Sequence, residues 1–304
     1  VIVTLRRNGD NMESKRTHWL IHFIFLFCSA AAILPILLVV AISLSSEDSI
    51  NKFGYAIIPH EFSLYAYQYV FSDPHVLLRA YGNTIFATVV GTMACLIITS
   101  ALAYPISRKS IPFRRFFTMF VVCTILFNGG LVPWYIVMKN YLHFNDNLWA
   151  LVVPGLMLNG FNVLIMRTFF VNTIPTELLE AAYMDGAGEL RIFLQIVIPL
   201  SKPVYATIGL FATLAYWNDW FNSMVFQVNH DNYSMQYVLQ SILLNLQYLA
   251  QNTRSNNMSA SLASLPQETS RMAMAIIAIG PIIFAYPFFQ KYFIKGLTIG
   301  AVKG

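Results

Sequence analysis

The stretch EAAYMDGAGELRIFLQIVIPLSKP runs from Glu180 to Pro203 and separates two strongly apolar parts of the chain. Pro175, shortly before it, suits the start of a helix, because its missing N–H would have no partner in a first turn anyway. The glycines of DGAG permit a sharp reversal of the backbone, and the two prolines near the end mark the joint with the next apolar run. The stretch therefore predicts a short helix, a tight turn and a second helix.

The first of these helices carries small residues on one face. Leu178, Ala181 and Ala182 share that face through their i, i+3 and i, i+4 spacing, and the alanines let another backbone approach closely. Glu180 offers a carboxylate beside this contact. Two interpretations follow from these residues alone: a surface that docks a partner, or a helix pair that only connects its flanking segments.

The composition is that of a membrane protein. The chain has 304 residues, of which 57% are hydrophobic and 11% are charged, whereas about 25% of the residues in a soluble domain are charged. The net charge of +5 does not indicate a nucleic-acid partner, because the basic residues are scattered and no aromatic–basic motif accompanies them.

Apolar runs of the length needed to cross a bilayer, about 20 residues, predict an all-α membrane protein. The first run is too long for the apolar core of a cleaved signal peptide, so we expect a retained helix. Six spans are predicted, between a segment 1–18 and a tail 290–304: Trp19–Leu44, Thr84–Ile106, Phe116–Met138, Leu148–Phe170, Val204–Phe226 and Met272–Phe289.

The distribution of lysine and arginine predicts the orientation of these spans. With the N-terminus in the cytoplasm, most of the 19 basic residues fall in cytoplasmic segments, as the positive-inside rule requires. Both termini are then cytoplasmic, and 172–202 is the longest internal loop. On the outer side, Gln227–Arg271 is rich in Asn, Gln and Ser, which predicts an exposed, partly mobile loop.

The opening stretch carries a resemblance to a known family. EAA at 180–182, then Gly186 four residues after Ala182, then IVIP at 196–199, resembles the EAA motif of the permeases of binding-protein-dependent ABC importers. The family pattern ends in Ile-x-Leu-Pro, and here Ile198 replaces the leucine. The longer string EAAYMDGAG resembles the carbohydrate branch of the family.

Other strings resemble the same family over most of the chain from about residue 60. GNTIFATVVGTMACLIITSALAYPISRKSIPFRR (82–115) is similar to the start of the permease core, and WNDWFNSM (217–224) is similar to the Trp-Asn region of sugar permeases. KGLTIGAVKG (295–304) is similar to the end of the second, maltose-type permease. NGGLVPWYIVMKNY (128–141) and NGFNVLIMRTFF (159–170) resemble permeases for larger oligo- and polysaccharides.

The resemblance implies a fold, a function and a set of partners. It implies one permease domain over 1–304, with the six-helix type I importer fold, in a bacterial cell membrane. Such a chain pairs with a second, homologous permease and with two ATPase subunits, and an external solute-binding protein delivers an oligosaccharide or polysaccharide. The loop 172–202 would be the coupling loop, in which Glu180, Ala181, Ala182, Asp185 and Gly186 transmit closure of the ATPases to the spans.

No catalytic or nucleotide-binding motif occurs in the sequence. The phosphate-binding GxxxxGK[ST] and the HExxH and GxSxG motifs are missing, so we expect no enzyme activity and no cofactor in this chain. ATP and Mg²⁺ would bind to the partner ATPases. His18 and His22 have a spacing that can hold a metal on a helix face, but no third ligand is near, so no metal site is predicted.

The candidate solute pathway lies in the outer half of the fifth span. Trp217 and Trp220 are predicted to share a face, where an aromatic ring can cover the C–H face of a sugar while Asn218 and Asp219 bind hydroxyls. The alternative interpretation is an aromatic belt at the membrane interface for the two tryptophans and a helix–helix hydrogen bond for Asn218 and Asp219. Weaker candidates, in the third and fourth spans, are Trp134, Tyr135 and Asn162.

Two other classes of protein remain as alternatives. An ion-coupled secondary transporter of a small solute needs coupling groups at mid-membrane and often has inverted repeats, but the sequence shows one candidate, Asp219, and no repeat. A membrane enzyme needs converging acids, bases or metal ligands, and the spans hold few ionisable residues. Two interpretations also remain for the basic tail 290–304: it contacts the ATPases, or it is a short cytoplasmic tail without such a contact.

Overall fold

The computed structural model describes residues 2–155, 157–256, 266–280, 282, 283 and 287. These residues are predominantly helical, and the part of the chain described contains no β-strand, only an isolated bridge between Ser45 and Phe62. The chain divides into two compact units, one formed by Val1–Ser72 with Leu243–Ile277 and the other by Asp73–Ile242 with Ala278–Gly304. Each unit is described by itself below.

The first unit contains the long helix α1 (Ile2–Ser43), in which His18–Ser43 is apolar enough to cross a membrane. This part coincides with the predicted first span. Most of the large apolar side chains from Trp19 to Leu37 are more than half exposed. Water would not favour such a surface, so lipid or another chain has to cover it.

Two short helices, α2 (Glu47–Phe53) and α3 (Tyr65–Val70), follow α1 in the same unit. Glu47 joins α2 to the helix that begins at residue 267. Its carboxylate accepts hydrogen bonds from the backbone N–H of Glu268 and Thr269, both at 3.0 Å, and from Oγ1 of Thr269 at 2.7 Å. A carboxylate at a helix N-terminus satisfies donors that have no partner within the helix and complements the helix dipole.

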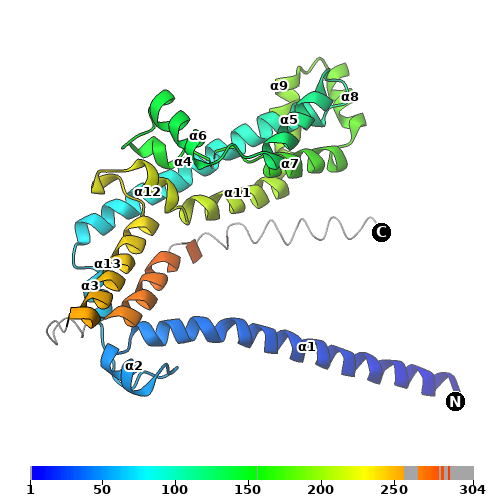
Figure 1. Ribbon diagram of the computed structural model, residues 1–304. Coiled ribbons are helices and arrows are strands. Elements are labelled where there is room, and N and C mark those ends of the chain that lie inside the picture. Colours follow the sequence, from blue (N-terminus) through cyan, green and yellow to red (C-terminus); the bar gives the residue numbers. More distant parts are fainter. Residues whose placement is uncertain (1, 156, 257–265, 281, 284–286, 288–304) are drawn as a thin grey trace. The chain divides into compact units, whose positions relative to one another are not determined.

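The second unit is built on three packed helices, α4 (Pro74–Ser107), α7 (Gly160–Thr173) and α11 (Lys202–Trp217), which run side by side in Figure 1. Helix α4 contacts the Tyr216 ring of α11 at Gly91. A Cβ at this position would lie 2.3 Å from Cζ of Tyr216 on α11. Membrane helices use small residues to bring backbones together in this way.

Helix α4 is longer than the predicted span Thr84–Ile106. Its 34 residues correspond to about 50 Å at 1.5 Å per residue, more than the thickness of a bilayer core. The helix begins at Pro74 because Asp73 caps it, accepting a hydrogen bond from the N–H of Val76 at 3.3 Å. The extra N-terminal turns carry His75, Arg79 and Asn83 among apolar residues, so the predicted apolar span begins only after them.

Three other predicted spans are not continuous helices. Phe116–Met138 is divided between α5 (Arg114–Leu126), α6 (Leu131–Ile136) and the π-helical η1 (Val137–Tyr141), with a bend of 111°. Leu148–Phe170 begins with the short 3₁₀ helix η2 (Leu148–Leu151) and becomes regular only in α7. Val204–Phe226 is interrupted after α11 and continues as α12 (Phe221–Phe226).

Local chemistry explains each interruption. Gly130 (φ 88°) and Gly155 (φ 80°) adopt left-handed backbone conformations, which glycine reaches without the steric cost that a side chain would add. Asp219 starts α12 after the break that follows α11, because its Oδ1 accepts hydrogen bonds from the N–H groups of Phe221 and Asn222 at 3.1 and 3.3 Å.

The described residues therefore do not show six spanning helices. Two helices, His18–Ser43 and Pro74–Ser107, are long and apolar enough to span, or up to four if each bent pair counts as one span. The second bent pair joins Glu189–Leu200 to Lys202–Trp217 at 80°. Of the predicted sixth span, 272–280, 282, 283 and 287 are helical, and the remainder and the tail 290–304 lie outside the described residues.

In the predicted mobile loop Gln227–Arg271, the described residues 227–256 and 266–271 are instead largely helical, and 257–265 lie outside the described residues. It contains the 3₁₀ helix η4 (His230–Asn232), the 22-residue helix α13 (Met235–Asn256) and the start of the helix from residue 267. The prediction was wrong because it relied on polar composition. The buried side chains of α13 include Met235, Val238, Leu239 and Leu246, which is an amphipathic helical pattern.

Candidate coupling and translocation sites

The EAA stretch forms the predicted helix, turn and second helix. Helix α8 (Thr176–Met184) ends before Gly186, which has φ 76°. The chain then continues through α9 (Glu189–Ile192), the π-helical η3 (Phe193–Val197) and α10 (Ile198–Leu200) into α11. The N–H of Ala187 donates to the carbonyl of Ala182 at 3.0 Å and closes the turn.

Helix α8 packs one face on its own chain and leaves the other face free. Leu179 and Ala182 are buried, and they join a core cluster with Ile192 and Val197 of the returning segment. The two alanines predicted to share a docking face are therefore separated, because Ala182 faces the core whereas Ala181 is exposed. The outer face also includes the remaining predicted coupling residues, which are exposed: Glu180, Asp185 and Gly186.

Apolar side chains that the motif did not indicate extend this outer face. Met184 is 88% exposed and Leu190 is 70% exposed. An exposed methionine is a flexible, polarisable contact that adapts to a partner surface. The sequence contained a signal for Met184, since it lies three residues after Ala181 and four after Glu180, on the same side of a helix.

A polar cluster joins this loop to the C-terminal end of α4. The hydroxyl of Tyr104 donates to Oε2 of Glu189 at 2.5 Å, and the hydroxyl of Tyr183 donates to Oε1 of the same carboxylate. Nη2 of Arg108 donates to the Tyr183 hydroxyl at 3.4 Å. Burial, together with the hydrogen bond to Glu189, raises the pKa of Tyr183, so its hydroxyl keeps its proton and remains a donor.

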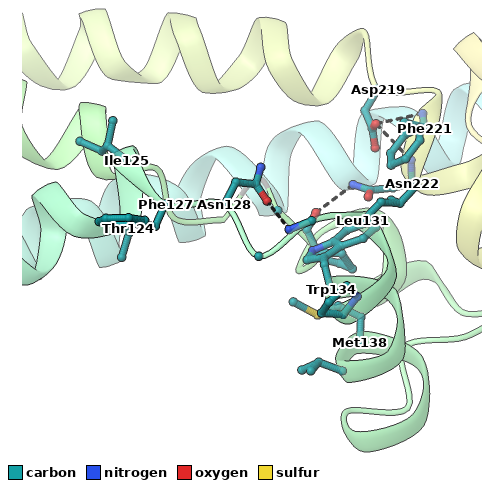
Figure 2. A pocket seen from close by; sticks show the side chains of 16 residues that line it. Thr124, Ile125, Phe127, Asn128, Leu131, Trp134, Met138, Asp219, Phe221 and Asn222 are labelled. Carbon is teal, nitrogen blue, oxygen red and sulfur yellow. Dashed lines mark hydrogen bonds between the residues drawn. The ribbon is translucent and has the colours of Figure 1, made fainter.

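A second candidate site is a cavity of about 790 Å³ in the same unit (Figure 2). It is lined by the joint between α5 and α6, by Pro154–Gly155 and by the joint between α11 and α12. The rings of Trp134 and Phe221 stack at its wall, with centroids 6.1 Å apart and an interplanar angle of 25°. The amide of Asn222 donates to the carbonyl of Pro154 at 3.0 Å and holds two of these segments together.

Two of the predicted pathway residues, Trp134 and Asp219, line this cavity. Trp217 and Trp220 do not share a helix face, because α11 ends at Trp217. Trp217 is 5% exposed, and its Nε1 donates to the carbonyl of Ala278 at 2.8 Å. Trp220 is exposed and contacts Phe221 edge to face. Asn218 donates to the carbonyl of Leu214 at 2.8 Å and thereby caps α11.

The two weaker candidates, Tyr135 and Asn162, are not among the residues that line the cavity. Tyr135 stacks on Phe226 with centroids 5.9 Å apart, and it accepts a hydrogen bond from Nζ of Lys139 at 2.5 Å. Asn162 is buried in α7, 7% exposed. The prediction missed Asn128, Phe221 and Asn222, which do line the cavity. Asn128 lies in the quoted string NGGLVPWYIVMKNY, so its place before two glycines was an available signal.

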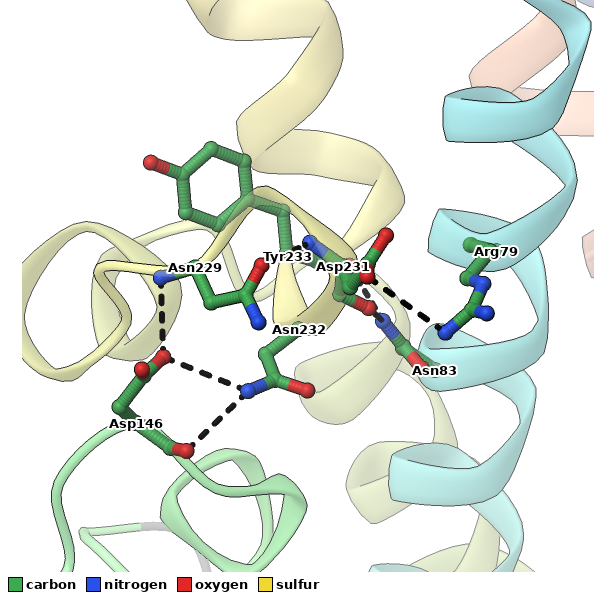
Figure 3. Close-up of polar contacts among 7 residues, drawn as sticks. All are labelled: Arg79, Asn83, Asp146, Asn229, Asp231, Asn232 and Tyr233. Carbon is green, nitrogen blue, oxygen red and sulfur yellow. Dashed lines mark hydrogen bonds and ion pairs between the residues drawn. The ribbon is translucent and has the colours of Figure 1, made fainter.

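At the other end of α4, a second polar cluster holds the loop that precedes α13 (Figure 3). Nδ2 of Asn83 donates to the carbonyls of Asp231 and Tyr233 at 2.7 and 3.0 Å. The Asp146 carboxylate accepts from the N–H of Val228 at 3.2 Å and of Asn229 at 2.9 Å. The hydrogen bond from Asn229 is the main reason that the pKa of Asp146 is lowered.

Helix α4 therefore connects the two polar clusters. The cluster of Tyr104 and Arg108 meets the EAA loop, and the cluster of Arg79 and Asn83 meets the loop at 228–234. Asn83 and Tyr104 are 21 positions apart, which is about 30 Å along the helix axis at 1.5 Å per residue. A bilayer core is about 30 Å thick, so these two loops can lie on opposite sides of a membrane.

Comparisons with known proteins bear on the whole chain. Residues 9–299 match the model of the family described as "Binding-protein-dependent transport system inner membrane component". The chain is 39% identical over 275 residues to "Protein LplC" of Bacillus subtilis (strain 168), covering 90% of each chain. It is 34% identical over 299 residues to the "Polygalacturonan/rhamnogalacturonan transport system permease protein YtcP" of the same organism, covering 96% of this chain and all of that one.

A solved structure shows the same fold. It is described as the "Crystal structure of a bacterial ABC transporter involved in the import of the acidic polysaccharide alginate", and it matches with a TM-score of 0.75 and 31% identity, covering 92% of this chain and 98% of that chain. The resemblance read from the EAA stretch is thereby confirmed. The chain belongs to the family of binding-protein-dependent transport system inner membrane components.

Proposed function

We propose that this chain is one permease subunit of an ATP-driven importer, which translocates an oligosaccharide or polysaccharide delivered by an external solute-binding protein. The observation that carries the proposal is helix α8 of the EAA loop. One of its faces packs on the core and the opposite face, with Glu180 and Met184, is exposed. In a permease of this family, a rigid helix with one exposed face provides a surface on which an ATPase subunit can dock and through which it can move the permease.

The assembly follows from the family and from the surface of this chain. We propose that the chain forms one permease domain in a bacterial cell membrane with both termini in the cytoplasm, paired with a second, homologous permease. The uncovered apolar side chains of α1 support contact with lipid and with such a partner. Two ATPase subunits bind the ATP and Mg²⁺, and this chain contributes no cofactor.

Coupling is assigned to the exposed face of α8. Glu180, Ala181, Asp185 and Gly186 contact the ATPase, and Met184 adds an apolar contact in the same place. Ala182 acts from the other side, because its burial keeps the helix packed against the core. A rigid helix can transmit the rotation of a docked subunit to the helices on which it packs, as in other rigid-body transitions.

The solute pathway is assigned to the cavity of Figure 2. Trp134 and Phe221 offer aromatic surface for the C–H face of a sugar ring, and Asp219 and Asn128 offer polar groups for its hydroxyls. Trp217, Trp220 and Asn218 support the pathway indirectly, by ending α11 where the wall of the cavity begins. Tyr135 supports the lining from behind, since it stacks on Phe226, which contacts Trp134.

The alternative of an ion-coupled secondary transporter has no support in the comparisons. Its single candidate group was Asp219. The structure gives this carboxylate another purpose, since it accepts the backbone N–H groups that begin α12. A carboxylate used as a helix cap has less capacity to bind a coupling ion.

The function is tested in the purified importer, reconstituted with its solute-binding protein, by measuring ATPase stimulation and uptake across a panel of oligosaccharides. We expect stimulation and ATP-dependent uptake with at least one saccharide. Glu180→Lys and Gly186→Val should abolish both responses while the permease still folds, because they change the contact face and the turn behind it. Normal ATPase docking and transport in both variants would contradict the coupling role.

A further inference from the structure

The residue Glu189 occupies an unusual place, because its carboxylate lies between two tyrosines that come from different parts of the fold. Tyr104 is on the membrane helix α4, and Tyr183 is on α8. Both hydroxyls donate to this one carboxylate, each to a different oxygen atom. Glu189 thus connects the exposed helix of the EAA loop to the longest helix of the second unit.

Arg108 completes this arrangement from the end of α4. Its guanidinium lies 5.9 Å from the ring centroid of Tyr104 and 5.8 Å from that of Tyr183, and it donates to the Tyr183 hydroxyl. A cation over an aromatic face is attracted by the ring quadrupole, so Arg108 is attracted to both rings. Tyr104 is fixed from its other side by Phe193, with ring centroids 5.0 Å apart.

The remaining contacts of α8 cannot hold its register by themselves. Leu179 and Ala182 pack on the core through apolar surface, and such contacts have no direction. The turn that follows α8 contains Gly186 and Gly188, whose backbones have more conformational freedom than those of other residues. Hydrogen bonds to an ionised carboxylate are directional and about twice as strong as neutral ones.

We propose that Glu189 is the positioning residue of the EAA loop, and that the clamp of Tyr104, Glu189 and Tyr183 makes α8 and α4 move as one body. A displacement of α8 then reaches α7 and α11, which pack on α4, and the loop at 228–234 through Asn83. This inference rests on the proposed function, since it concerns how movement of a docked ATPase reaches the pathway.

The test uses the full importer in proteoliposomes with its solute-binding protein, and the measured quantity is the number of ATP molecules hydrolysed per saccharide imported. Glu189→Gln weakens both hydrogen bonds at similar volume, and we expect the ratio to rise at least five-fold while basal ATPase activity stays within two-fold. Glu61→Gln is the matched control, an exposed glutamate far along the sequence that accepts from Ser46, and it should leave the ratio unchanged.

Removing the tyrosine hydroxyls shows whether the three residues act as a unit. Tyr104→Phe and Tyr183→Phe should each raise the ratio less than Glu189→Gln does. Combining either of them with Glu189→Gln should add little, because residues in one hydrogen-bond network are not additive. Fully additive effects of the three substitutions would overturn the clamp.

A second measurement covers the case in which Glu189→Gln fails to assemble with the ATPases. Spin labels at Leu102→Cys on α4 and Met184→Cys on α8, in a background without the native cysteines, report the distance between the two helices. We expect one narrow distribution with Glu189 and a broad one with Glu189→Gln. A narrow distribution in both proteins, or an unchanged ratio, would refute the clamp.

The proposed function fails in a different way. If Glu180→Lys leaves transport and ATPase docking intact, the EAA loop is not the coupling element and the function proposed above is wrong. If Glu180→Lys abolishes transport whereas Glu189→Gln changes neither the ratio nor the distance distribution, the loop couples without the clamp.

Discussion

Gly91 is the position at which one added methyl group should cost the most. In Gly91→Ala the new Cβ would lie 2.3 to 2.6 Å from three carbon atoms of the Tyr216 ring, well inside van der Waals contact. The ring has no space to move aside, because Tyr216 is 2% exposed and its hydroxyl donates to the carbonyl of Val152 at 2.8 Å. Helix α4 must therefore separate from α11, or the ring must give up its hydrogen bond.

The expected cost follows from these two routes. Overpacking a core costs about 1–3 kcal/mol, and a lost hydrogen bond adds about 1 kcal/mol. We expect Gly91→Ala to destabilise the purified permease by about 3 kcal/mol, which is roughly a 100-fold change in the unfolding equilibrium constant. The assay is equilibrium unfolding in mixed micelles, followed by tryptophan fluorescence and circular dichroism.

Gly82 provides the matched control on the same helix, since a Cβ there would meet no atom within 4 Å. Gly82→Ala should leave stability unchanged or raise it by up to about 1 kcal/mol, as alanine favours a helix over glycine. In a Tyr216→Leu background, Gly91→Ala should cost much less, because the ring atoms that it meets are gone. Equal unfolding curves for Gly91→Ala and Gly82→Ala would refute the argument from close packing.

Three further outcomes are expected. Trp134→Ala should raise the KM for the saccharide about ten-fold with little change in ATPase docking, because the ring stacked on Phe221 is lost; an unchanged KM would remove it from the pathway. Glu47→Ala should lower the unfolding free energy by about 1–2 kcal/mol through loss of the cap on the helix from residue 267, and equal stability would show that the cap contributes nothing. The pKa of Asp146 is lowered, so the stability that its ionised carboxylate gives to the folded protein is complete above the ordinary carboxyl pKa of about 3.9. This stability is lost as the pH falls through the lowered pKa of the folded state. Amide hydrogen exchange at Asn229 should then lose protection below about pH 4 in the wild type but not in Asp146→Asn, and a loss at the same pH in both would contradict this.

The two polar clusters on α4 bind two different loops. One end holds the EAA loop through Glu189, and the other end holds the loop at 228–234 through Asn83. The cavity lined by Trp134 and Asp219 belongs to the same unit. In the function proposed here, one continuous helix thus relates the surface for the ATPase, the solute pathway and the outer loops.

The EAA stretch was the part of the chain that sequence reasoning described best. Its glycines and prolines act locally, within a few residues of themselves, and local steric rules are the same in any protein. The helix, the turn and the returning helix therefore appear where the pattern placed them. The apolar composition likewise predicted a membrane protein, because a surface that faces lipid needs few charged residues wherever it lies in the fold.

The spans were predicted less well, because hydropathy measures how apolar a segment is but not where its backbone bends. Gly130, Gly155 and Asp219 interrupt three of the predicted helices. Each of these interruptions is stabilised by one or two specific hydrogen bonds or by a left-handed glycine, and averaging over a window of about 20 residues conceals them. Trp217 and Trp220 were placed on one face only because the break between them was missed.

The sequence by itself determined the family, the helical class and the position of the EAA loop, since each of these depends on local pattern or on average composition. Only the tertiary structure decided which face of α8 is free, that Glu189 meets Tyr104 across 85 positions, and that Phe221 and Asn222 rather than Trp217 line the cavity. These are pairings between distant segments. They depend on how whole helices pack, and no short stretch of residues carries that information.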